Sequence, residues 1–244
     1  MVKSKELKLM RKKLEKLSKE SDNFPKDGAG ILPKSSNSDA AADASDVEVQ
    51  YWNSNDIVSA PKNASQNKNR LEQFLQLFER NMADQYRQSS WGLNLPEKKE
   101  ELSHAKARYL VLLDNGNNAS TETKQVEEKE NNNSSDDNDN DLIGYCHYRF
   151  DYDDDEDPTE VVLYVYELQI AAAHRRRGYG RQLMAMAEEL ARSREIPKVM
   201  LTVFKANTAA MEFYTSSLKY TMDPSSPSQH KQFADYEILC KQVL

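Results

Sequence analysis

The 244-residue sequence contains no apolar run near the ~20 residues that a membrane-spanning helix needs. It has only two cysteines, Cys146 and Cys240, which stand inside strand-like patterns and lack the spacing of metal ligands. The first residues form no apolar signal-peptide core, and Val2 stands where N-myristoylation requires glycine. These absences predict a soluble intracellular protein in a reducing compartment, with no membrane contact, no disulfide and no metal.

Hydrophobic residues make up only 38% of the chain, which is low for a wholly globular protein. They are concentrated from about Arg70 onward. Residues 23–68 are rich in Ser, Asn, Asp, Ala and Lys and predict a disordered linker. Residues 69–244 predict one folded domain. Within it, the Asn-, Asp- and Glu-rich residues 115–141 predict a disordered acidic insertion between two strands.

The net charge of −7 is unevenly distributed. Residues 122–160 hold fifteen acidic residues against Lys124, Lys129 and Arg149, a net charge of −12, so the remainder carries +5. A local acidic patch of this kind suggests a basic partner.

Residues 1–22 predict a basic amphipathic helix. Residues 3–19 contain eight Lys or Arg, and apolar side chains recur at helical spacing at Leu7, Met10, Leu14 and Leu17. Such a helix suits contact with nucleic acid, with an acidic surface such as a ribosome or nucleosome, or with a nuclear import receptor. The alternative is a solvated helix of marginal stability.

The alternation of strands and helices in the second half of the domain predicts an α/β fold with a central mixed sheet flanked by helices. A helical stripe begins near Leu71, and Pro96 opens a short second helix. The expected later elements are strands over 109–113, 142–152 and 161–170, a helix over 180–195, a strand over 198–204, a helix over 207–218 and a strand over 233–240.

The sharpest motif is Arg175-Arg176-Arg177-Gly178-Tyr179-Gly180, which directly follows a strand and opens a helix. Glycines allow the backbone to approach an anion, and amide groups at a helix N-terminus favour a phosphate. A dinucleotide-binding Rossmann fold is excluded, since no acidic residue ends a second strand at the required distance. The remaining alternative is an ordinary strand-to-helix turn with basic side chains.

This motif resembles the Arg/Gln-x-x-Gly-x-Gly/Ala loop with which enzymes of the GNAT superfamily bind acetyl-CoA. A second segment, Asn207-Thr-Ala-Ala-Met-Glu-Phe-Tyr214, is similar to the superfamily's Asn-x-x-Ala-x-x-x-Tyr helix start. The two segments occur in the expected order, separated by a helix and a strand. The resemblance implies a GNAT fold and an acetyltransferase that uses acetyl-CoA.

A closer resemblance covers most of residues 70–240. Five segments are similar to the NatD-type N-alpha-acetyltransferases of histones H-four and H-two-A: residues 82–92, 147–151, 162–169, 198–205 and 223–228. This resemblance implies transfer of an acetyl group to the N-terminal amine of histone tails that begin Ser-Gly-Arg-Gly, in the cytoplasm and nucleus. The long acidic insertion departs from the compact family pattern.

The resemblance also implies residue roles. Glu167 is the expected general base, acting through a water beside Tyr166. The expected cofactor-binding residues are Leu168, Gln169, Ile170, Arg176, Arg177, Gly178, Tyr179, Gly180, Arg181 and Asn207. The expected substrate-binding residues are Tyr86, Trp91, Asp151, Tyr152, Asp153, Tyr166, Thr202 and Tyr236. Close-set aromatic side chains suit the small first residues of the tail, and carboxylates suit its arginine.

The residues alone leave alternatives open. Tyr164 and Tyr166 could pack a strand, Asp151 and Asp153 could belong to the solvated run that ends at Asp157, and Glu167 could be a surface carboxylate. Two other functions compete: a GNAT enzyme that acetylates lysine side chains or another amine, and a non-catalytic module that binds nucleosomes or ribosomes.

Overall fold

The computed structural model describes residues 4–20, 47–58, 70–114, 141–154 and 158–244. Most of the predicted linker (23–46 and 59–68), most of the predicted insertion (115–140) and residues 155–157 of the acidic run lie outside the described residues.

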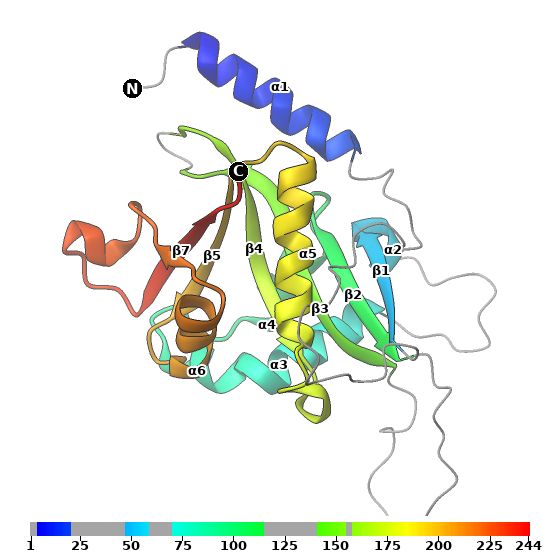
Figure 1. The fold of residues 1–244 in the computed structure, drawn as a ribbon. Coiled ribbons are helices and arrows are strands. Elements are labelled where there is room, and N and C mark those ends of the chain that lie inside the picture. Colours follow the sequence, from blue (N-terminus) through cyan, green and yellow to red (C-terminus); the bar gives the residue numbers. More distant parts are fainter. Residues whose placement is uncertain (1–3, 21–46, 59–69, 115–140, 155–157) are drawn as a thin grey trace, which may run out of the picture.

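A sheet of seven strands forms the centre of the molecule, in the order β1-β2-β3-β4-β5-β7-β6 (Figure 1). The β4–β5 pair is parallel and the other neighbours are antiparallel, so the predicted mixed sheet is confirmed. The strands are β1 (Val47–Asn53), β2 (Arg108–Asp114), β3 (Leu142–Tyr152), β4 (Val161–Ile170), β5 (Lys198–Phe204), β6 (Thr221–Met222) and β7 (Tyr236–Gln242).

Helices cover both faces of the sheet (Figure 1). One core lies between the sheet and α5, and a second lies between the sheet and α2, α3 and α4. The helices are α1 (Ser4–Glu20), α2 (Ser54–Val58), α3 (Arg70–Gln88), α4 (Leu95–Ser103), α5 (Tyr179–Ser193) and α6 (Thr208–Glu212). Short turns of other helical types span Ala172–His174, Phe213–Ser217 and Pro227–His230.

Local sequence explains where α4 and α5 begin. The Asn94 side chain accepts a hydrogen bond from the Glu97 amide, and Pro96 occupies the first turn of α4, where its missing amide hydrogen costs nothing. Gly178 precedes α5 in the left-handed conformation, with φ of 88°. That backbone shape favours glycine, because a side chain there is strained.

Strand β1 and helix α2 correct the sequence analysis, which placed residues 47–58 in a linker. The segment Val47-Glu-Val-Gln-Tyr-Trp-Asn53 alternates apolar and polar side chains and pairs with β2 along its length. Val49 and Tyr51 face the α5 core and Trp52 packs against the opposite core. The period-two pattern was present, but the polar composition around it masked the strand.

Two further boundaries differ from expectation. The helix predicted over residues 207–218 is α6 followed by a π-helical turn at Phe213–Ser217. The last strand begins at Tyr236 rather than Phe233, whose side chain is fully exposed.

The predicted basic helix corresponds to α1, which packs on the α5 side of the sheet. Leu17 is buried there, and Met10 and Leu14 contact the same core. Among the helices that the structure describes, none has the length and apolar character that crossing a bilayer requires.

The ends of the acidic insertion meet at the fold. The Asp114 amide donates to the Asp141 carbonyl at 2.8 Å, so β2 and β3 are joined at their ends. Arg70 holds the Asp141 carboxylate from α3 at 2.5 and 2.9 Å. Asp141, which was assigned to the insertion, is therefore part of the folded domain.

We predict that a short turn can replace residues 115–140, because Asp114 and Asp141 already lie at bonding distance. Thermal unfolding should show a change in Tm below about 3 °C, the shift that roughly 1 kcal/mol produces in a domain of this size. As a control, the same deletion with Asp141→Asn should lower Tm further by weakening the Arg70 ion pair. A large loss in the simple deletion would show that the insertion supports the fold.

Candidate active site

The site lies where β4 and β5 separate. Their parallel pairing ends at Val165 and Leu201, but β4 runs on to Ile170 and β5 to Phe204. Each strand keeps its outer partner, since β3 pairs with β4 to Ile170 and β7 pairs with β5 to Phe204. The inner edges of the diverging segments therefore face one another without strand pairing.

A β-bulge shapes β4 at the same point. His147 of β3 pairs with Glu167 and Tyr148 pairs with Val165, so Tyr166 is the extra residue. The bulge breaks the usual alternation. Tyr166 and Glu167 both reach the α4 side of the sheet, where Tyr166 contacts Arg149 and Glu167 contacts Lys98. Val165 and Leu168 pack on the α5 side.

A cavity of about 110 Å³ occupies the gap between the two strands. From the α3 side it is lined by Met82, Tyr86 and Trp91, and from β4 and β5 by Val165–Gln169 and Leu201–Phe204. From the α6 side it is lined by Asn207, Ala210 and Tyr214. Because residues of both faces line it, the cavity connects the two sides of the sheet.

Aromatic side chains form the wall at the α3 end. The Trp91 ring lies 5.1 Å from both Phe204 and Tyr236, and Tyr86 meets Phe204 edge-on at 5.1 Å. Trp91 remains 49% exposed, which leaves an aromatic surface at the mouth. The Ser90 amide donates to Asp235 at 2.6 Å and ties the loop of Trp91 to the start of β7.

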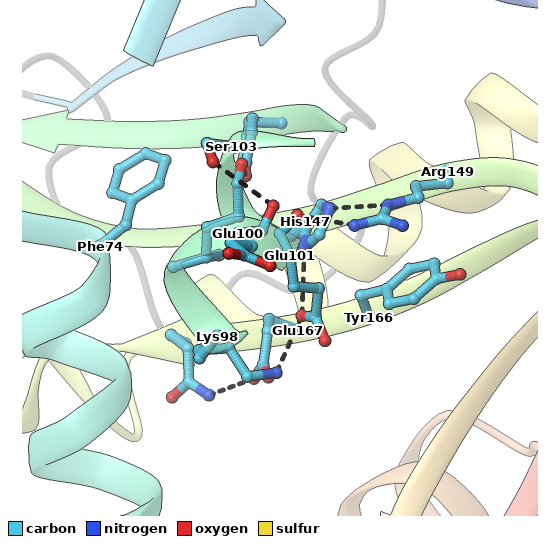
Figure 2. A network of polar contacts seen from close by, with 12 residues as sticks. Phe74, Lys98, Glu100, Glu101, Ser103, His147, Arg149, Tyr166 and Glu167 are labelled. Atoms are coloured by element: carbon cyan, nitrogen blue, oxygen red, sulfur yellow. Dashed lines mark hydrogen bonds and ion pairs between the residues drawn. The ribbon is translucent and has the colours of Figure 1, made fainter. Parts of the chain in front are cut away.

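Glu167 is a buried carboxylate whose two oxygens both accept hydrogen bonds. Lys98 Nζ of α4 lies 2.8 Å from Oε1, and Gln169 Nε2 donates to Oε2 at 2.7 Å. Lys98 is itself buried and also donates to Glu101 at 2.8 Å. Figure 2 shows this group with His147 and Arg149 on the neighbouring strand. The alternative of a surface carboxylate at Glu167 is wrong.

Burial and neighbouring charges shift the pKa values of Lys98, Glu101 and His147. Burial opposes the charge of Lys98, but Glu167 and Glu101 outweigh it and raise the pKa of the ammonium above its usual value. Burial raises the pKa of Glu101 against the opposing effect of Lys98. Burial, and then the positive charges of Arg149 and Lys98, lower the pKa of His147 well below its usual value, so its ring is neutral.

Tyr166 and Asp151 lie together at the edge of this group. The Tyr166 hydroxyl donates to Asp151 Oδ2 at 3.2 Å, and the Arg149 guanidinium lies 4.3 Å from the centre of the Tyr166 ring. Burial and then the Asp151 charge raise the pKa of Tyr166, so the hydroxyl stays protonated. On β5, Thr202 shares a hydrogen bond with the Tyr164 hydroxyl.

Two of the expected substrate-binding residues lie elsewhere. Tyr152 is on the opposite face of β3 from Asp151 and lines a different cavity, beneath α1. The Asp153 carboxylate accepts hydrogen bonds from Thr159 and from the Glu160 amide in the turn between β3 and β4. Although burial opposes it, these bonds lower the pKa of Asp153. The structure does not bring these two side chains to the cavity between β4 and β5.

The glycine loop lies on the α5 side. Gly178 has φ of 88° and Arg176 has φ of 64°, so the loop turns sharply into α5, whose first amides have no partner within the helix. A methyl group on Gly180 would lie 3.4 Å from the Phe213 ring, so the loop sits close to the π-helical turn. Arg176, Arg177 and Arg181 are exposed around it.

The arginines of the loop have different tasks. Arg175 binds the Ile170 carbonyl at 3.2 Å and the Asn81 side chain, so it fixes the loop to the end of β4. Asn81 in turn donates to Gln169 at 2.8 Å. Within the part of the chain that the structure describes, Arg176 and Arg177 are the exposed side chains of this run that do not fix the loop to β4. The structure therefore fits a pyrophosphate-bearing group at this loop.

Asn207 and Tyr214 lie across the cavity from β4. The Asn207 Oδ1 accepts a hydrogen bond from the Ala210 amide and so caps α6. The Nδ2 group of the same side chain takes no part in this cap. Tyr214 is buried, and burial raises the pKa of its hydroxyl. A protonated hydroxyl at this position can donate to a leaving group.

The sequence did not predict four residues that belong to the site: Lys98, Glu101, Arg149 and Phe204. Lys98 and Glu101 belong to the run Glu97-Lys-Lys-Glu-Glu101, which is typical of a solvated helix surface. A usable signal was the spacing of Lys98 and Glu101 by three residues, which places them on one side of the helix.

Comparison with solved structures gives distant matches. The chain is 13% identical to the PaiA N-acetyltransferase of Thermoplasma acidophilum in complex with coenzyme A (TM-score 0.48, 80% of this chain and 98% of that chain). It is 12% identical to Arabidopsis thaliana NAA60 in complex with a bisubstrate analogue (0.45, 70% and 94%). It is 20% identical to a nourseothricin acetyltransferase (0.38, 57% and 66%). None of these structures reaches a TM-score of 0.5.

A family model gives the identification. The model of the acetyltransferase (GNAT) family matches residues 80–220, more than half of the chain. The matched range contains the separating strands, the bulge, the glycine loop and Asn207. This protein therefore belongs to the GNAT acetyltransferase family and is an acyltransferase that uses acetyl-CoA.

Proposed function

We propose that this enzyme acetylates the N-terminal α-amine of histone tails that begin Ser-Gly-Arg-Gly. The observation that carries the proposal is the pairing of a small aromatic cavity with a carboxylate at its edge. Tyr86, Trp91 and Phe204 leave room for an amine with little side-chain bulk. Asp151, bonded to Tyr166, lies at the edge of the site where a third-residue arginine would need an anionic partner.

In the proposed reaction, bound acetyl-CoA would supply a thioester. The amine nitrogen would bond to the acetyl carbon, the carbon–sulfur bond would break, and coenzyme A would leave as its thiol. An α-amine has a pKa of about 7.7–8.0, so a useful fraction is neutral near pH 7. Glu167 receives the amine proton through a water. Both of its oxygens are already bonded, but each has a further lone pair. The inner edge of β4 beyond Val165 provides amide donors for the acetyl oxygen.

The glycine loop and Asn207 hold the cofactor in this proposal. The amides of Gly178, Tyr179, Gly180 and Arg181 open α5, and helix N-termini favour phosphate groups. Asn207 lines the cavity on the α6 side, where its amide can contact the pantetheine chain. Leu168, Gln169 and Ile170 present their inner strand edge to the same chain.

The basic surface of α1 suits an anionic partner. Met10, Leu14 and Leu17 pack inward, whereas the basic side chains Lys8, Arg11, Lys12 and Lys19 are exposed. We propose that this surface contacts a ribosome or nucleosome, the places where a histone tail becomes available in the cytoplasm or the nucleus.

The substrate proposal predicts selective use of a free N-terminus. A Ser-Gly-Arg-Gly peptide should be acetylated on its α-amine, and the same peptide with a blocked N-terminus and an added lysine should be a poor substrate. Mass spectrometry of the products locates the acetyl group. Efficient acetylation of the lysine in the blocked peptide would favour a side-chain acetyltransferase.

The cofactor assignment predicts a specific effect at Gly178. Gly178→Pro should abolish binding of coenzyme A, because proline cannot adopt φ of 88°. Gly178→Ala should weaken it roughly tenfold, since an alanine in the left-handed conformation costs about 1–2 kcal/mol. Gly92→Ala is the matched control: it also has positive φ and open space at Cβ, but lies beside Trp91. Calorimetric titration that shows equal losses at both positions would contradict the assignment.

The arginine assignment predicts coupling between Asp151 and the peptide. Asp151→Asn should lower kcat/KM for Ser-Gly-Arg-Gly about ten- to hundredfold, the loss of a charge-assisted contact worth roughly 1.5–3 kcal/mol. The change should cost little with Ser-Gly-Ala-Gly, which lacks the guanidinium. Asp153→Asn tests the other expected carboxylate, whose oxygens are engaged in the β3–β4 turn. Additive losses for Asp151→Asn and the alanine peptide would show that the two groups do not interact.

A further inference from the structure

Lys98 contacts the proposed base from the side of the sheet that α4 covers. We infer that Lys98 is a positioning residue for acetyl transfer, whose buried ammonium pairs with the Glu167 carboxylate and fixes its orientation at the cavity. The inference rests on the proposed role of Glu167 and extends it to a residue that touches neither substrate nor cofactor.

The surroundings of Lys98 are built to hold a positive charge. Its ammonium lies 2.8 Å from Glu167 Oε1 and 2.8 Å from Glu101 Oε1. It also lies 4.7 Å from the centre of the Phe78 ring and 5.4 Å from that of Tyr86, where ring faces attract cations. The residue is only 7% exposed. Since Tyr86 lines the cavity, Lys98 joins the base to the aromatic wall.

Lys98 is the cation that compensates Glu167 within the described part of the chain. From β3, Arg149 is directed elsewhere: its guanidinium donates to the Glu101 carbonyl at 2.6 Å and to His147 at 3.4 Å. His147 is neutral because burial lowers its pKa. Glu101 of α4 and four tyrosine hydroxyls also lie within electrostatic reach of Glu167. Burial, and in addition the charge of Glu167, raise the pKa of Glu101 and of these hydroxyls, which belong to Tyr86, Tyr109, Tyr145 and Tyr214.

A merely stabilising role explains this arrangement poorly. Burying an ion pair costs desolvation of both charges, and apolar side chains of similar volume often stabilise a core as well or better. A general base, by contrast, must be unprotonated before it can accept a proton from the substrate. Inside a protein, an uncompensated carboxylate takes up a proton from solvent and can no longer accept one from the substrate. Lys98 supplies a compensating charge beside Glu167, and with Gln169 it fixes both oxygens of that carboxylate.

The test is the kinetics of Lys98→Met. We expect kcat to fall roughly tenfold or more at neutral pH, which is within the range that general base catalysis supplies. The KM for acetyl-CoA should change less than about twofold, because Lys98 lies on the substrate side. The acid limb of the pH profile of kcat/KM should move to higher pH, because a carboxylate without its cation holds a proton more tightly. Lys98→Arg should restore the acid limb toward its original position.

Lys99→Met is the matched control, one residue along α4. Lys99 is exposed and pairs with Glu72 at 3.2 Å on the surface, so its loss should leave the pH profile unchanged. If Lys98→Met fails to fold, Lys98→Met with Glu101→Gln removes one charge of each sign, and the same shift of the acid limb is expected.

The Glu167→Gln background separates positioning from stability. Lys98→Met should add little to the loss caused by Glu167→Gln, because both changes act on one group. An additive loss, or a Lys98→Met enzyme with unchanged kcat and pH profile, would overturn the inference alone. A fully active Glu167→Gln enzyme would overturn the proposed base and the inference together.

Discussion

The separation of β4 from β5 creates the cavity. The neighbouring strands β3 and β7 limit the number of backbone groups that this separation leaves unpaired. A strand edge without a partner leaves backbone groups unpaired, which costs free energy when they are buried. Here each strand leaves only its inner edge unpaired, since β3 pairs with β4 to Ile170 and β7 pairs with β5 to Phe204. The outer strands keep both segments paired, and the inner edges retain backbone donors and acceptors that face the cavity.

The bulge at Tyr166 gives this gap its chemistry. In regular alternation Tyr166 and Glu167 would point to opposite faces, and either the hydroxyl or the carboxylate would face α5. The extra residue turns both toward α4, where Tyr166 meets Asp151 and Glu167 meets Lys98. Leu168 then faces the α5 core and closes the site below. One inserted residue thus sets the positions of two neighbouring functional groups.

Local sequence patterns predict most strands and the glycine loop. They do not predict a residue whose role depends on contacts with distant parts of the chain. The strands from Leu142 to Ile170 and the glycine loop were predicted because periodicity, glycines and the following helix are local signals. Lys98 was not, because the feature that distinguishes it from Lys99 is a carboxylate 69 residues away. Tyr152 was expected in the same site as Asp151, although neighbours in a strand face opposite ways. The strand β1 was lost when composition was averaged over a long polar stretch.

The ion pair at Glu167 bears on which amine the site can serve. Under the proposed function, this carboxylate takes a proton from an amine that is already partly neutral. At pH 7 roughly 10% of an α-amine with a pKa near 8.0 is neutral, against about 0.04% of a lysine with a pKa near 10.4. That ratio corresponds to about 3 kcal/mol that a lysine acetyltransferase must supply by stronger proton abstraction or by desolvation. The proposed N-terminal amine therefore asks less of the base than a lysine side chain would.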